Sequence, residues 1–146
     1  MPVMLDPAPA AALPDSIWPM VAWFTPNETE AALYTGSDFA SEESANQLLA
    51  RGLKGVVLKR GGEGAYVAVA ESKADWVPAF AVKAVDTVGA GDCYNGAFAV
   101  GLLEGRDPWS AARFASAAAA ISVTRRGAQA SMPSRSEVDA FLAQHS

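Results

Sequence analysis

The sequence has 146 residues, of which 51% are hydrophobic and 18% charged, so it can bury one compact core and does not belong to the class of disordered polymers. The formal net charge of -5 leaves no broad basic surface to neutralise phosphates, which argues against nucleic-acid binding. With one cysteine, no signal-like start and no apolar run of membrane-spanning length, we expect a cytoplasmic protein that acts on small molecules.

Two short apolar runs near the start of the chain predict buried parallel strands. They cover residues 3–5 and 20–24, and each is followed by a proline within two or three residues. A capping residue, early acids and good helix formers predict a helix over residues 27–33 that ends near Gly36. A second helix is expected over residues 41–51, with Ser41 at its start.

The middle of the chain has the pattern of a hairpin. Residues 55–58 and 65–70 are apolar, and the turn between them, residues 59–64, contains three glycines. Residues 76–85 should continue as extended chain, interrupted by Pro78.

The last part of the chain should be helical. We expect one helix from about residue 93 to 103, a second over residues 108–124 and a third over residues 136–144. Strand-helix alternation followed by a hairpin and packed helices predicts an α/β fold with a mainly parallel sheet and an antiparallel edge.

The glycine-containing loop at residues 86–92 has the composition of an anion site. The small residues Gly89, Ala90 and Gly91 allow backbone N–H groups at a helix N-terminus to converge on a phosphate. Asp92 would then stand at the mouth of this site, where it could take a proton from an attacking hydroxyl. Alternatively, the loop is an ordinary tight strand-to-helix connection and Asp92 an ordinary acid in the first turn.

Four segments resemble motifs of the ribokinase, or PfkB-type, family of carbohydrate kinases. They read DTVGAGD at 86–92 with NGAF at 95–98, LDPAPA at 5–10, TPNETE at 25–30, and AAAAISVTRRGAQ at 117–129. The resemblance implies a ribokinase-like three-layer α/β/α fold. Residues 1–146 would be its C-terminal, nucleotide-binding part, with the N-terminal sugar-binding half and lid absent.

The resemblance also implies roles for individual residues. Asp92 would be the catalytic base, with Gly89, Ala90 and Gly91 as the anion hole. ATP would bind with Mg²⁺, and Asn27 and Glu30 would organise the metal through water, unless they only cap a helix. The implied nucleotide contacts are Asn27, Lys59, Arg60, Gly61, Gly62, Glu63, Gly64, Gly91, Asp92 and Ser116.

The sequence departs from the family's usual motifs at several of these positions. Lys59 stands where threonine is usual, Gly62 where serine is common, and Ser116 where asparagine or histidine is frequent. Asp6 replaces the usual asparagine of the first motif. The phosphate and base contacts are therefore expected to differ from those of the family.

A monovalent cation, K⁺, is implied beside the anion hole, where it would fix the loop; alternatively, Asp86 merely caps the turn. The positions that match the family's monovalent-cation site are Asp86, Val88, Ser122, Arg125, Gly127 and Ser131. Glu30 is the residue implied for the divalent metal.

The function implied is ATP-dependent phosphoryl transfer to a sugar hydroxyl, D-ribose to ribose 5-phosphate in the complete enzyme. Two alternatives stay open: another PfkB-type kinase, acting on fructose or a nucleoside, and a truncated, inactive nucleotide-binding or dimerisation module. The partners expected are ATP and a sugar. Because the strand at residues 3–5 would have an uncovered edge, we also expect self-association or association with a missing N-terminal half.

Overall fold

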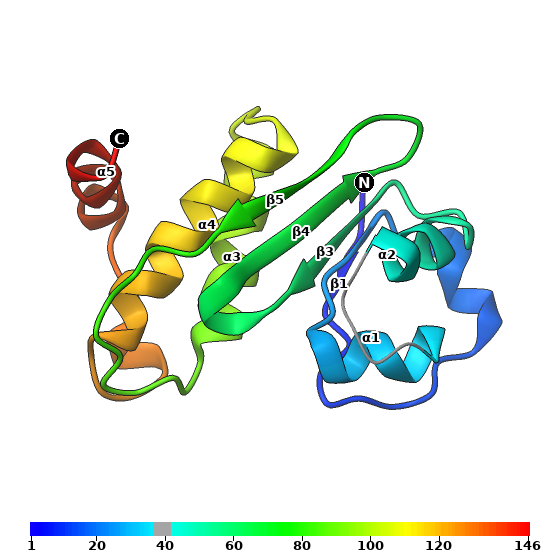
Figure 1. Ribbon diagram of the computed structural model, residues 1–146, viewed down its shortest axis with the longest axis horizontal. Helices are drawn as coiled ribbons and strands as arrows, with labels where there is room; N and C mark the ends of the chain where they lie inside the picture. Colours follow the sequence, from blue (N-terminus) through cyan, green and yellow to red (C-terminus); the bar gives the residue numbers. More distant parts are fainter. Residues whose placement is uncertain (37–41) are drawn as a thin grey trace. The chain divides into compact units, whose positions relative to one another are not determined.

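The structure, a computed structural model, describes residues 1–36 and 42–146. These residues form two compact units, Met1–Val77 and Pro78–Ser146, and most of their helices and strands are labelled in Figure 1. The first unit carries the sheet, and the second is helical.

The first unit is built on a mixed sheet. β1, β2 and β3 run parallel, with Leu5 opposite Phe24 and Phe24 opposite Val56, and β4 pairs antiparallel with β3. The predicted combination of parallel strands with an antiparallel hairpin is confirmed. In spatial order the strands are β1 (Met4–Leu5), β2 (Trp23–Phe24), β3 (Gly55–Lys59), β4 (Gly64–Val69) and β5 (Ala74–Pro78).

The strand predicted over residues 20–24 is wrong at its start. Only Trp23–Phe24 is a strand, and Asp15–Met20 forms the 3-10 helix η1. Pro19 fixes a backbone angle inside this helix, and the N–H of Val21 closes its last turn on the carbonyl of Trp18 at 3.2 Å. Met20 therefore ends a helical turn and is exposed.

Two helices accompany the parallel strands. α1 (Glu28–Thr35) ends at Gly36, as predicted, in the left-handed conformation that favours glycine. α2 (Glu42–Leu49) is shorter than predicted at its end, because the N–H of Arg51 bonds to Leu48 three residues earlier and tightens the last turn. The expected start at Ser41 lies outside the described residues.

The core of the first unit is apolar and includes Phe24, the last residue of β2. The ring of Phe24 is fully buried and meets those of Trp18 and Tyr34 edge to face, at centroid distances of 5.1 and 5.3 Å. Leu48 of α2 and Leu58 of β3 complete this core with no exposed surface. The ends of β2 and β3 are thus packed into this buried core.

The second unit is built from helices. It contains α3 (Ala90–Leu103), α4 (Pro108–Val123), the 3-10 helix η3 (Gln129–Ser131) and α5 (Arg135–Gln144). α4 begins as predicted, with Asp107 accepting from two first-turn N–H groups and Pro108 at the first helical position. α5 begins one residue earlier than predicted, since Ser134 and Glu137 form a reciprocal capping box.

The prediction that α3 begins at about residue 93 is wrong by three residues. The helix begins at Ala90 because Gly89, with φ of 78°, turns the chain directly into it. Ala90, Gly91 and Asp92 therefore belong to the first helical turn rather than to a preceding loop.

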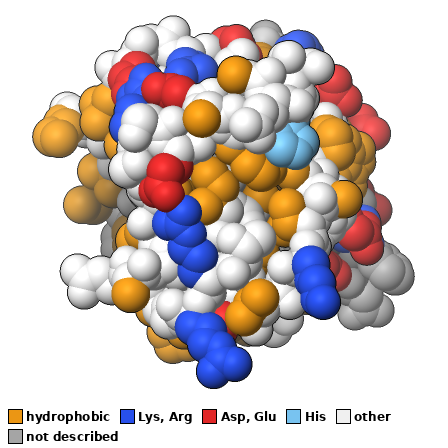
Figure 2. Space-filling view, turned by 90° about the vertical axis from the view of Figure 1, so that its left-hand side faces the viewer, with side chains coloured by type: hydrophobic (Ala, Val, Ile, Leu, Met, Phe, Trp, Pro, Cys, Tyr) orange, Lys and Arg blue, Asp and Glu red, His pale blue; other side chains and the backbone are white. Residues whose placement is uncertain are grey.

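Aromatic side chains close the end of this unit. The imidazole of His145 stacks on Phe141 at 4.0 Å between ring centroids and meets the edge of Phe80 at 5.5 Å. Figure 2 shows the histidine beside orange hydrophobic side chains, on a face that carries both basic and acidic groups. His145 thus packs on the helix instead of extending as a free tail.

No helix in residues 1–36 or 42–146 is long and apolar enough to cross a membrane.

Candidate functional site

Asp92 lies at the N-terminus of α3, as the sequence predicted. It is the third residue of the helix and is exposed, so its carboxylate can be reached by a substrate. The first backbone N–H groups of an α-helix have no carbonyl one turn earlier to bond to, and the macrodipole gives this end positive potential. Ala90 was predicted to offer its N–H to an anion. In the structure this N–H already donates to the carbonyl of Thr87 at 3.2 Å. The N–H groups of Gly91 and Asp92 are left as the donors of this end of the helix.

A pocket of about 260 Å³ opens beside Asp92. Its walls are mainly apolar and include Phe114 and Val138, which belong to the buried core of the second unit. Cys93 also lines it, and burial raises the pKa of the Cys93 thiol, which keeps it a neutral, packed side chain. Asp92 is therefore a carboxylate at the rim of an apolar recess.

The loop before α3 is tied to a second loop, the one that follows α4. Asp86 accepts hydrogen bonds at 3.0 Å from the backbone N–H groups of both Val88 and Gly127. These bonds, chiefly the one from Val88, hold the pKa of Asp86 below its ordinary value. Gly89 faces Ala128 so closely that a Cβ added at Gly89 would lie 3.1 Å from the Ala128 Cα. The two loops thus position the first turn of α3.

The remaining residues of the predicted cation site lie in and around the loop that follows α4, from Ser122 in the last turn of that helix to Ser131 in η3. The carbonyl of Ser122 accepts from the N–H of Arg125 at 3.1 Å, and the hydroxyl of Ser131 donates to the carbonyl of Ala128 at 2.6 Å. The structure therefore places the six residues in one unit, in the loop before α3, the last turn of α4, the segment that follows α4, and η3. It also supports the simpler alternative for Asp86, since its Oδ1 accepts from the Val88 N–H and so caps the turn.

Sequence reasoning named Arg125 as a position of the cation site but missed Glu137 and Ser134, the residues that anchor it. The guanidinium of Arg125 pairs with Glu137 of α5, whose carboxylate also accepts from the N–H of Ser134 at 2.7 Å. The hydrogen bond from Arg125, followed by the one from the Ser134 backbone, lowers the pKa of Glu137 to about 2. The signal available in the sequence was the capping-box spacing of Ser134 and Glu137.

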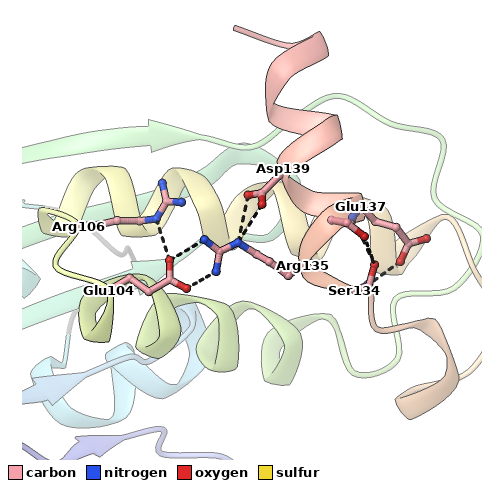
Figure 3. A network of polar contacts seen from close by, with 7 residues as sticks. Glu104, Arg106, Ser134, Arg135, Glu137 and Asp139 are labelled. Carbon is pink, nitrogen blue, oxygen red and sulfur yellow. Dashed lines mark hydrogen bonds and ion pairs between the residues drawn. The ribbon is translucent and has the colours of Figure 1, made fainter.

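A neighbouring ion-pair network holds α5 against the end of α3. Arg135 pairs with both Glu104 and Asp139, and Glu104 also meets Arg106 at 3.8 Å (Figure 3). The guanidinium groups of Arg106 and Arg135 both lie over the ring of Phe114, at 4.7 and 5.1 Å from its centroid. Since Phe114 and Arg135 line the pocket beside Asp92, this network fixes one of its walls.

In the first unit, Asn27 and Glu30 form a complete capping box at the start of α1. The side chain of Asn27 accepts from the N–H of Glu30 at 2.9 Å, and the Glu30 carboxylate accepts from the N–H of Asn27 at 2.8 Å. Glu30 is only 5% exposed. The helix-capping alternative is therefore confirmed, and a role with Mg²⁺ stays a prediction.

Lys59 lies at the same edge of the sheet as Asn27. β1, β2 and β3 are parallel, so the residues that follow them meet at their carboxyl ends. Lys59 forms a bridge with Asn27, and its N–H donates to the carbonyl of Pro26 at 2.9 Å. Its ammonium group pairs with Asp6 at 3.3 Å. Asp6 and Lys59 are two of the positions at which the sequence departs from the family motifs. They lie 53 residues apart in the chain and are in contact in the structure.

The glycine-rich turn after Lys59 is compact. Gly61–Glu63 forms the 3-10 helix η2, and Gly64, with φ of 117°, leads into β4. Arg60 pairs with Glu63 at 3.3 Å and with Glu28 of α1 at 3.9 Å. Across the described ranges, no group of three or more histidine, cysteine or acidic side chains could hold a metal ion by itself.

Ser116 does not lie in an open contact position. It is 5% exposed on α4, and its hydroxyl is near that of Tyr94, yet neither oxygen forms a well-shaped hydrogen bond with a described residue. Burial raises the pKa of Tyr94 far above its ordinary value. Whether the Ser116 hydroxyl contacts a base stays a prediction.

A mixed, largely parallel sheet in the first unit and packed helices in the second define an α/β protein. Residues 1–135 match the pfkB family of carbohydrate kinases. Since the match covers most of the chain, the protein belongs to this family.

Known relatives agree in sequence and in fold. The ribokinase of Haemophilus influenzae is 42% identical over 144 residues, which are 96% of this chain and 47% of that protein. The crystal structure of ribokinase from Thermotoga maritima matches with a TM-score of 0.90 and 44% identity, over 97% of this chain and 49% of that one. Arabidopsis thaliana ribokinase, solved with ribose and ATP, matches with a TM-score of 0.89 and 35% identity, over 97% and 47%. The chain spans about half the length of the relatives it matches.

Proposed function

We propose that this chain supplies the C-terminal, nucleotide-binding part of an ATP-dependent sugar kinase, with D-ribose as the acceptor in the complete enzyme. The observation that carries the proposal is the exposed carboxylate of Asp92 in the first turn of α3, beside the N–H groups of that turn. The similarity to a ribokinase solved with ribose and ATP supports both substrates.

In the proposed reaction, Asp92 accepts the proton of a sugar hydroxyl as its oxygen attacks the γ-phosphorus of ATP. A new oxygen–phosphorus bond forms, the bond between the γ-phosphorus and the bridging oxygen to the β-phosphate breaks, and ADP leaves. The N–H groups of Gly91 and Asp92 stabilise charge on the transferred phosphoryl group. The contacts of Asp86 and Gly89 keep these donors in place.

Mg²⁺ bound to the nucleotide phosphates fits the edge of the first unit where the carboxyl ends of β1, β2 and β3 lie. Four acids stand at this edge, Asp6, Glu28, Glu30 and Glu63, against the two bases Lys59 and Arg60. An acidic excess attracts a divalent cation, and Mg²⁺ is held mainly by phosphate and water with one or two protein groups. We assign those groups to Asn27 and Glu30, acting through water. When bound, the ion neutralises charge on the phosphates.

The loop pair of the second unit fits a monovalent cation such as K⁺. The carboxylate of Asp86 uses two of its roughly four acceptor positions for N–H groups, which leaves capacity for a cation. Backbone carbonyls of the two loops are suitable oxygen ligands. The cation would hold the loop that precedes α3.

Two alternatives differ from this proposal in measurable ways. A fructose- or nucleoside-type kinase of the same family would keep nucleotide binding but prefer another acceptor. An inactive nucleotide-binding or dimerisation module would bind nucleotide, or a second chain, without phosphoryl transfer in any context.

The first test is a calorimetric titration of the chain with MgADP, under conditions where thermal unfolding shows it folded. Binding is expected at millimolar nucleotide or below. The second test is Asp92→Asn in the complete enzyme, assayed with ribose, deoxyribose, fructose and nucleosides. It should lower kcat by on the order of 10²-fold or more, with ADP affinity little changed, because asparagine cannot accept the proton. Near-normal turnover would refute the role of Asp92.

A further inference from the structure

The ion pair between Asp6 and Lys59 joins two strand ends at the carboxyl edge of the first unit. The Lys59 Nζ lies 3.3 Å from the Asp6 Oδ1, and the two side chains are 26% and 14% exposed for Asp6 and Lys59 respectively. A charge held at that depth is stabilised by its partner, since the loss of either one would leave an incompletely solvated ion. The pair is therefore more than a mobile surface contact.

The position of Lys59 gives this pair a role towards anions. Its backbone is bonded to Pro26 and bridged to Asn27, so the lysine adjoins the N-terminus of α1. A helix N-terminus and an ammonium group both attract negative charge. The carboxylate of Glu30 in α1 already accepts a hydrogen bond from the Asn27 N–H. Lys59 is thus one of the two basic residues of this edge, with Arg60, and its ammonium group is already paired with Asp6.

Resting on the proposed nucleotide-binding function, we propose that Asp6 is an internal counter-ion that competes with nucleotide phosphate for Lys59 and so sets the affinity of this edge for nucleotide. A lysine ammonium has three donors and can hold Asp6 and a phosphate oxygen together. The carboxylate nevertheless repels the phosphate while the ammonium attracts it. Asp6 is in this sense a positioning residue that lowers affinity.

Four forms of the chain test the proposal: wild type, Asp6→Asn, Lys59→Thr and the double variant. The probe is ADP without Mg²⁺, titrated calorimetrically at low and at high salt. Asp6→Asn should bind most tightly, by on the order of tenfold over wild type, and Lys59→Thr most weakly, since it leaves an unpaired carboxylate. Wild type and the double variant should lie between them. The spread should shrink at high salt.

Two controls keep the result interpretable. Asp15→Asn makes the same charge change at an exposed position of η1 and should leave ADP affinity unchanged. The double variant removes both charges at once, so it should fold even where a single variant with an unpaired charge does not.

Distinct outcomes would overturn the proposal. If Asp6→Asn and Lys59→Thr both fold and bind ADP with the same affinity as the wild type, the ion pair has only a structural role. The proposed kinase function would not be affected by that result. A parallel titration with MgADP gives a further outcome. If Asp6→Asn binds MgADP more weakly than the wild type but binds Mg²⁺-free ADP equally well, Asp6 is a metal ligand and not a competitor for Lys59. Absence of ADP binding to every form would refute the proposed nucleotide site together with this inference.

Discussion

The carboxylate of Asp86 bonds to the backbone N–H of Gly127, 41 residues further along the chain, at 3.0 Å. With its second bond, to the N–H of Val88, it joins the loop before α3 to the loop after α4. The N-terminus of α3 is therefore held by a contact across the second unit, and the nucleotide binding that we propose there should depend on that contact.

Asp86→Ala should lower the affinity of the chain for ADP by on the order of tenfold, because two N–H groups lose their acceptor and the loops separate. It should also remove any difference in affinity between KCl and choline chloride at equal ionic strength. Calorimetric titration in both salts measures the effect. Asp75→Ala is the matched control, since the hydrogen bond that Asp75 accepts comes from the adjoining N–H of Trp76. Equal affinities in the two variants would contradict the prediction.

Gly89→Ala should destabilise the protein by about 1–3 kcal/mol, since a side chain there must adopt an unfavourable positive φ and also press on Ala128. Gly105→Ala is the control, because Gly105 has a φ of 82° but no heavy atom of the described residues within 4 Å of the added Cβ. It should cost about 1 kcal/mol. Denaturant unfolding compares them. If both variants lost the same stability, the contact with Ala128 would carry no energy.

The ion pair of Glu137 should make stability depend on pH in the acid range. Its pKa is lowered from 4.5 to about 2 in the folded protein. As the pH falls, Glu137 therefore takes up a proton at a higher pH in the unfolded chain than in the folded one. The stabilisation should be complete above the unfolded value, and it should be lost as the pH falls through about 2. Melting temperatures of wild type and Glu137→Gln should therefore differ above about pH 5 and converge towards about pH 2. A difference that does not change with pH would rule out the ion pair as its source.

Ser116→Ala should lower ADP affinity by roughly 2- to 10-fold if the buried hydroxyl bonds to the base, which is the range of one hydrogen bond. The melting temperature should stay the same or rise, because a buried hydroxyl without a well-formed bond is costly in the free chain. Tyr94→Phe removes the neighbouring hydroxyl and should leave affinity unchanged. Loss of stability without loss of affinity in Ser116→Ala would mean that the hydroxyl is structural.

Much of the fold could be predicted from the sequence because its signals are local. The cap at Asp107-Pro108, the stop at Gly36 and the hairpin around the glycine turn each involve residues a few positions apart. The predictions failed where a local signal was overridden. Met20, at the start of an apolar run, ends η1 after Pro19, and α3 begins three residues early, directly after Gly89.

The candidate site divides in the same way. The sequence by itself determined the family, the acid at the start of α3 and the capping pair of Asn27 and Glu30, since each depends on a motif or on neighbouring residues. Only the tertiary structure decided that Asp6 pairs with Lys59 and that Asp86 bonds to Gly127. These contacts join residues 53 and 41 positions apart, and they follow from strand order and loop packing, which no local spacing encodes.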